Sequence, residues 1–237
     1  MVDDEVVSNV SLNTMELIID GIPQKAIQIG TVMTHPNFRR QGLAYQLLKE
    51  ILEDYDELYD LFFLAAEEEA LHLYKKCGFI PREENKYIID VTDYKKIDTP
   101  LKPLHVTKEL LLDIKKQALP LSNILSAIGD EHVLMIYYIL GFNEAIYQPL
   151  PGVYTIFIIK GKTLNLFNIL SDKKVNLQEI IERITPSEIE KVFCHFTPDQ
   201  PIQNLNSSID TSNIWMTRTN SNKGFPMLAR YPRISQT

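Results

Sequence analysis

The first chemistry that the sequence suggests is phosphate binding by one short segment of charged and small residues. The segment reads Arg39, Arg40, Gln41, Gly42, Leu43 and Ala44. Adjacent arginines suit phosphate, because each guanidinium offers planar, fork-shaped donors. Gly42 lets the backbone approach a ligand closely, and Ala44 adds little bulk. We therefore expect this segment to hold an anionic group.

A predicted strand and a predicted helix flank this segment. The strand covers residues 25–34, and the helix begins at Leu43 and continues to about Tyr59. Apolar residues at helical spacing form its expected core-facing stripe: Leu43, Leu47, Ile51 and Leu52. The unpaired N–H groups of the first helical turn would point at the anion, and the helix dipole favours negative charge there.

The same segment resembles the acetyl-CoA signature of the GNAT superfamily of N-acetyltransferases. The family pattern Q/R-x-x-G-x-G/A is matched by Arg39, Gly42 and Ala44. Residues 74–79, Y-K-K-C-G-F, are similar to the family's later Y-x-x-x-G-F element. One helix and one apolar strand, residues 61–66, lie between the two motifs. Two motifs in this order favour the family over a plain strand–turn–helix unit.

The resemblance implies that acetyl-CoA is the cosubstrate and that an amine attacks its thioester directly, without a metal. The backbone of Val32, Met33 and Thr34, on the signature strand, would hold the pantetheine arm and polarise the thioester. Residues 39–44 would hold the pyrophosphate. Tyr74 corresponds to the tyrosine that protonates the departing thiolate. That transfer runs from a phenol of pKa about 10 to a thiolate whose acid has a pKa of about 8.5.

Each assignment has a structural alternative. Val32 and Met33 are also suited to the core of a strand, and Tyr74 to packing on an amphipathic helix. No general base is visible, because the signature strand offers only neutral polar side chains. Glu67 falls where many relatives have an asparagine that bonds the pantetheine. It could serve as the base, but we favour a solvent-facing glutamate at a helix start.

The order of predicted elements divides the chain into two α+β units. Residues 1–97 form the GNAT-like unit, with a mixed, mostly antiparallel sheet flanked by helices. Residues 98–106 contain two prolines and form a linker. Residues 107–237 form a second unit that lacks both motifs. Its element order indicates a degenerate GNAT-like domain, as in certain tandem bacterial GNAT enzymes, or an unrelated α+β cap.

The remaining elements follow from apolar alternation, capping residues and turn residues. Strands are expected over 6–13, 15–20, 86–91, 154–160, 164–170, 192–196 and 214–218, and helices over 67–76, 107–118, 131–140 and 176–184 and from 185. Residues 203–213 are polar and are expected to form a mobile loop.

GNAT domains usually open with a strand and two helices before the hairpin that here begins near Val6. We therefore expect an N-terminally shortened member, which lacks one wall of the acceptor pocket. The outer edge of the hairpin, residues 6–34, would then be uncovered. An uncovered strand edge is a site for pairing, so we expect either the C-terminal domain to fold over it or two chains to associate through it.

Composition and charge narrow the function classes. The 237 residues are 45% apolar with a net charge of −7, and without a basic stripe nucleic-acid binding is disfavoured. Cys77 and Cys194 form no motif, which indicates a reducing compartment. No signal peptide is expected, and the longest apolar stretch, residues 133–140, is too short to span a bilayer. We therefore expect a cytoplasmic protein without membrane contact.

The predicted function is transfer of an acetyl group from acetyl-CoA to a primary amine of a small molecule or peptide. No metal site is expected, since the histidines and cysteines show no ligand spacing, and the chain could form a homo-oligomer. The alternative is a catalytically impaired GNAT-like module that binds CoA or a protein. The missing acceptor wall and Glu67 favour the module, and Tyr74 favours the enzyme.

Overall fold

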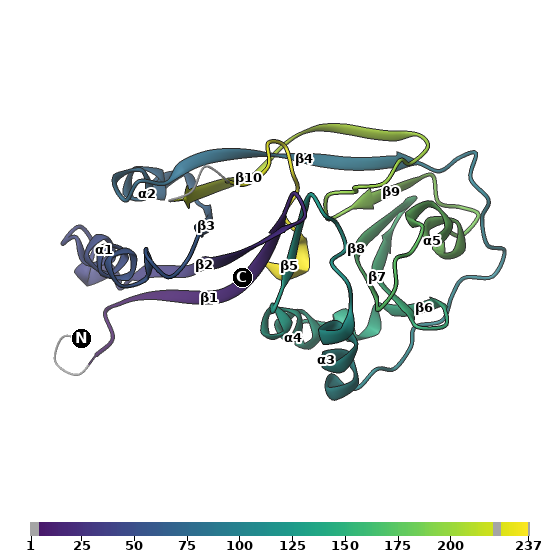
Figure 1. The fold of residues 1–237 in the computed structure, drawn as a ribbon, viewed down its shortest axis with the longest axis horizontal. Coiled ribbons are helices and arrows are strands. Elements are labelled where there is room, and N and C mark those ends of the chain that lie inside the picture. Colours follow the sequence, from purple (N-terminus) through teal and green to yellow (C-terminus); the bar gives the residue numbers. More distant parts are fainter. Residues whose placement is uncertain (1–4, 220–223, 237) are drawn as a thin grey trace.

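One mixed sheet of ten strands organises the described residues, 5–219 and 224–236, of the computed structural model (Figure 1). The strand order is β5-β1-β2-β3-β10-β4-β9-β8-β7-β6. Of the pairs of neighbouring strands, β2 with β3 and β8 with β9 are parallel, and the others are antiparallel. The predicted fold class, a mixed and mostly antiparallel sheet flanked by helices, is confirmed.

The elements of the first half follow the predicted order. They are β1 Ser8–Ile19, β2 Ile22–Thr34, η1 Pro36–Phe38, α1 Leu43–Tyr55, β3 Leu61–Ala66, η2 Glu68–Ala70, α2 Leu71–Lys76 and β4 Ile80–Asp90. The two strands predicted over residues 6–20 are one continuous strand, β1. It turns into β2 at Asp20 and Gly21, both at positive φ. Helix α1 ends before the predicted Tyr59, and Leu48, which the predicted stripe omitted, is fully buried.

The second half contains more strands than predicted. Its elements are α3 Lys108–Gln117, β5 Leu125–Ile128, α4 Glu131–Ile139, η3 Phe142–Glu144, β6 Ile146–Leu150, β7 Val153–Lys160, β8 Thr163–Ser171, α5 Leu177–Ile184, β9 Lys191–Cys194, β10 Leu205–Thr219 and η4 Arg233–Ser235. The caps at Thr107 and Asn176 are confirmed, because each side chain accepts a bond from a backbone N–H. The helix predicted from Thr185 is wrong, and the short strands β5 and β6 were not predicted.

The largest difference between the sequence prediction and the structure is at β10. Residues 203–213 were expected to form a mobile loop, but most of them belong to β10. This strand lies between β3 and β4, with Trp215 opposite Ala65 and Leu205 opposite Ile89. Residues 205–210 pair with β4, and residues 214–219 pair with β3. This pairing makes the segment a strand although its side chains are polar. The two predicted units therefore share one sheet.

The predicted uncovered edge of the hairpin is partly covered by the C-terminal half. Strand β5 pairs antiparallel with residues 16–19 of β1, and Ser126 lies opposite Ile18. Helices α1 and α2 cover one face of the first sheet region, around Leu48, Phe62 and Met216. None of the described helices is long and apolar enough to cross a membrane.

Candidate cofactor cleft

The two central parallel strands of the first unit separate partway along their length. Strand β2 pairs with β3 at Ala26, Ile27 and Gln28. Beyond Gln28, β2 continues to Thr34 beside β1, whereas β3 continues beside β10. The pairing of β2 with β3 thus ends at Gln28, and the residues expected to hold pantetheine, 32–34, lie beyond this point.

A β-bulge in β2 lies at this separation. Asn9 of β1 pairs with Met33 and Ser11 pairs with Gly30, so Thr31 and Val32 both oppose one residue. Thr31 has a φ of 47°, which is uncommon for a residue other than glycine. Bulges bend the strand that contains them, so this bulge re-aims the end of β2. Nothing in the sequence signals it, because threonine is an ordinary strand residue.

The turn before α1 presents unpaired backbone donors. Arg40 has a φ of 62° and Gly42 a φ of 81°, and the first bond of the helix runs from Gln46 N–H to the Gly42 carbonyl, 3.0 Å. Within the described residues, no backbone or side-chain group accepts from the N–H groups of residues 42–45. A Cβ at Gly42 would have no neighbour within 4 Å. This turn therefore has the open donors that an anion requires.

One side-chain bond ties this turn to the end of β2. Arg39 Nε donates to the Thr34 carbonyl, 3.2 Å, so the residues expected for pantetheine and for pyrophosphate adjoin. Arg39, Arg40 and Gln41 are exposed, while Leu43 and Ala44 are half-buried. The first three can therefore reach a ligand, and the last two anchor the helix. Met33 is 55% exposed, so it is not a core residue of the strand.

Tyr74 belongs to the core beneath this cleft. It is 6% exposed on α2, packs in one cluster with Phe62 and Leu64, and lies edge-on to Phe79 at 6.2 Å between ring centroids. Among the described residues its hydroxyl has no hydrogen-bond partner. Burial, and then the nearby Cys77 thiol, raise the pKa of Tyr74 above its usual value. The phenol is therefore protonated at neutral pH, as a proton donor must be.

An ion pair that was not predicted connects β10 to the end of α1. Arg218, on β10, holds Asp56 at the end of α1, with 2.9 Å between Nη2 and Oδ2. The Arg218 side chain also lies against Gly78, where an added Cβ would be 3.4 Å from Nε. The partners are 162 residues apart in the sequence, so no local pattern could reveal them. Glu67 is exposed, as the solvent-facing interpretation expected.

The second unit repeats the same construction, but the start of its helix is already bonded. Strands β7 and β8 form a hairpin, α5 follows, and β9 pairs parallel to β8 up to Leu166. The segment after α3 contacts the end of β8, because Leu119 N–H donates to the Ser171 carbonyl, 2.8 Å, and a pocket of about 510 Å³ remains beside them. At the start of α5, Gln200 Oε1 accepts from Leu177 N–H, 3.0 Å. The start of α1, whose N–H groups have no such partner among the described residues, is therefore the candidate site.

Comparisons with known proteins agree with this geometry. Residues 1–81 match the family model of an acetyltransferase (GNAT) domain. Residues 1–81 therefore form a GNAT-type acetyltransferase domain. No curated protein matches it. Within the described residues, no group of three or more His, Cys, Asp or Glu could hold a metal ion.

Solved GNAT structures share the fold over most of the chain. Each similarity covers 92% of this chain: Eis1 from Mycobacterium abscessus at 13% identity and TM-score 0.66, a GCN5-related N-acetyltransferase from Kribbella flavida at 14% and 0.61, and another from Anabaena variabilis at 19% and 0.57. The chain spans 62%, 58% and 61% of those three chains. At these identities the similarity shows the fold alone. The matched region includes both units of the chain.

Proposed function

We propose that this GNAT protein transfers an acetyl group from acetyl-CoA to a primary amine of a small molecule or peptide, by direct attack. The observation that carries the proposal is the point where β2 leaves β3, next to N–H groups at the start of α1 that have no partner among the described residues. At the equivalent helix start of the second unit, Gln200 already accepts from Leu177 N–H. In this proposal residues 1–97, completed by β10, form the catalytic unit, and residues 107–237 support it.

The residues of the first cleft fit acetyl-CoA in three places. The free N–H groups of residues 42–45 would bind the pyrophosphate, helped by Arg39 and Arg40. The backbone of residues 32–34 would bind the pantetheine arm and donate to the developing oxyanion. When bound, acetyl-CoA supplies an activated thioester, so no metal is needed.

Tyr74 would donate its proton to the departing thiolate. Its raised pKa keeps it protonated across the neutral range, although that same shift makes donation somewhat less favourable. Three consecutive exposed glutamates, residues 67–69, follow the end of β3. Their charge would attract a cationic amine. The amine must then lose its proton before it attacks the thioester.

The second candidate function is a module that binds CoA without transferring the acetyl group. The burial of Tyr74 favours it, because the hydroxyl belongs to a side chain packed among apolar residues. Two measurements on the full chain separate the candidates. Calorimetry with acetyl-CoA tests binding, and thiol release over a panel of primary amines tests transfer. Binding with amine-dependent thiol release supports the enzyme, binding alone supports the module, and no binding contradicts both.

A further inference from the structure

A cavity of about 290 Å³ lies within the second unit, away from the residues expected to bind the cofactor. Its walls come from α3, β5, the start of α4, β8 and the C-terminal residues Pro232 and Ser235. Leu119, Leu121 and Leu170 form much of its apolar lining. Small-molecule sites are typically concave, mostly apolar and equipped with a few polar groups. The cleft residues 32–44 take no part in it.

A buried amide faces this cavity with a free donor. Asn168, on β8, lines the cavity and is 6% exposed. Its Oδ1 accepts from Ile169 N–H, 2.9 Å, whereas its Nδ2 has no partner among the residues that the structure describes. Asn168 Nδ2 thus offers a donor that a ligand oxygen could satisfy.

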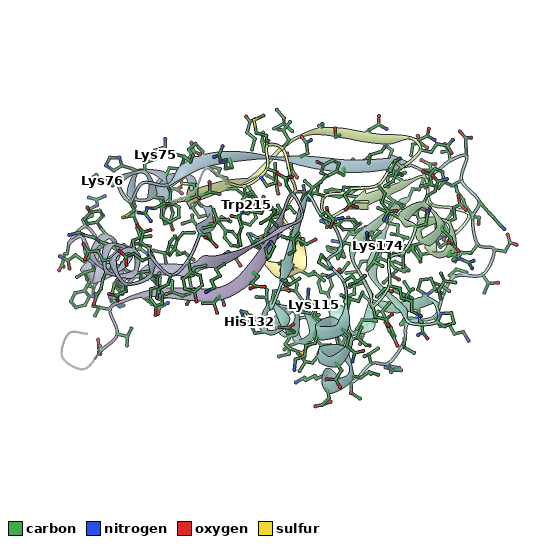
Figure 2. All side chains as sticks on the ribbon, in the orientation of Figure 1. Lys75, Lys76, Lys115, His132, Lys174 and Trp215 are labelled. Atoms are coloured by element: carbon green, nitrogen blue, oxygen red, sulfur yellow. The ribbon has the colours of Figure 1, made fainter. Side chains whose placement is uncertain are left out.

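Two lysines add further donors at the same cavity. Lys115 extends from α3 toward β5 (Figure 2), and its Nζ lies 2.7 Å from Asp130 Oδ1 and 3.4 Å from the Ala127 carbonyl. An ammonium group has three N–H donors, so one stays available. Lys116 is exposed and also lines the cavity. The donors of the cavity therefore suit a carboxylate.

The cavity is also lined by one carboxylate, which changes the class of ligand that the cavity favours. Glu131, at the start of α4, is half-buried and belongs to the lining. Together with Lys115, Lys116 and Asp130 it brings the formal charge of the site to zero. A plain anion would gain from the lysines but be repelled by Glu131. A zwitterion can satisfy both groups.

We propose that this cavity binds a free α-amino acid with an aliphatic side chain. Its carboxylate accepts from Asn168 Nδ2 and Lys115 Nζ, and its ammonium group donates to Glu131. Its side chain lies against Leu119 and Leu170. This ligand is distinct from acetyl-CoA and from the acceptor amine, and the proposal stands whether or not the first cleft transfers acetyl groups.

Three probes of matched shape test the charge arrangement. Leucine carries both charges, 4-methylpentanoate lacks the ammonium group, and isopentylamine lacks the carboxylate. Calorimetry with the full chain should show binding of leucine, with each analogue at least tenfold weaker. Leucine should also raise the melting temperature, because it contacts both α3 and β8. No binding of leucine at millimolar concentration, or equal binding of leucine and 4-methylpentanoate, would overturn the proposal.

Two variants test the named residues. Asn168→Asp keeps the Oδ1 bond to Ile169 N–H but replaces the Nδ2 donor by a negatively charged oxygen. We expect this variant to bind leucine more than tenfold more weakly. Because a buried aspartate can also disturb folding, Glu131→Gln gives a second test with no change of shape. We expect it to lower the affinity for leucine about tenfold, as for the loss of a charge-assisted hydrogen bond. The affinity for 4-methylpentanoate should not fall. Glu109→Gln, on the exposed first turn of α3, is the control and should change the affinity for neither ligand. Unchanged leucine affinity in Glu131→Gln contradicts the proposal.

Discussion

Replacing Met216 tests whether β10 is an integral part of the GNAT unit. Met216 is fully buried and packs with Leu48, Phe62 and Tyr74, although it lies more than 130 residues after them in the sequence. Truncating a fully buried methionine to alanine removes its packed atoms and leaves a cavity, which costs about 2–5 kcal/mol. With helices α1 and α2 fixed against the sheet, we expect about 3 kcal/mol for Met216→Ala.

Urea unfolding measures this loss, and the chain supplies its own reporter. Trp215 (labelled in Figure 2) is the single tryptophan, is 3% exposed and directly precedes Met216 in β10. At a denaturant slope of about 3 kcal/mol/M, the midpoint should fall by roughly 1 M. Ile209→Ala, on the same strand but 54% exposed, should change stability by about 0.5 kcal/mol or less. Equal losses in the two variants would refute the placement of β10 in the first core.

Three further predictions concern the cleft and its surroundings. Gly42→Glu should weaken acetyl-CoA binding at least tenfold by calorimetry, because it brings a negative charge to the free N–H groups. Gly152→Glu, also at positive φ with open space around it, carries the same strain and should bind normally, so equal affinities contradict the site. Tyr74→Phe should lower turnover about a hundredfold with unchanged acetyl-CoA affinity; unchanged turnover, with chemistry rate-limiting, would leave Tyr74 a packing residue. Burial, and then the charge of Arg230, lower the pKa of His195 to about 3, so the unfolded chain binds its proton first as the pH falls below about 6.5. The free energy of unfolding should therefore fall by about 1.4 kcal/mol per pH unit between pH 6.5 and pH 4 because of His195. In His195→Gln, urea titrations should show this dependence on pH reduced by the equivalent of about one proton. An equal dependence in the wild type and the variant would contradict the lowered pKa of His195.

The parts of the cleft that could be predicted are those set by neighbouring residues. The turn at Gly42, the helix start at Leu43 and the cap at Asn176 depend on local φ, ψ and hydrogen-bond chemistry, which residue type controls. Gly78, which follows α2, has a φ of 83°, a conformation that glycine adopts readily. Strand β3 was predicted at its exact bounds because its apolar run is short and bounded by polar residues.

The parts that could not be predicted depend on distant partners. Many side chains of β10 are polar and exposed to solvent, so they show no apolar alternation. Its pairing with β3 and β4 makes it a strand. Strand β5 is four residues long and exists through its pairing with β1. The bulge at Thr31 forces a threonine to positive φ, which the surrounding ladder imposes. No local sequence pattern indicates the ion pair of Arg218 with Asp56 or the bond from Leu119 N–H to the Ser171 carbonyl.

A crystal structure of the full chain with CoA would test the proposed cofactor site most directly. We expect the pyrophosphate on the N–H groups of residues 42–45, with Arg39 and Arg40 beside it. We expect the pantetheine arm between β2 and β3, along residues 32–34. CoA bound instead at the start of α5, with Leu119 displaced from Ser171, would contradict the proposed site. So would a site at residues 32–45 that stays empty at saturating CoA.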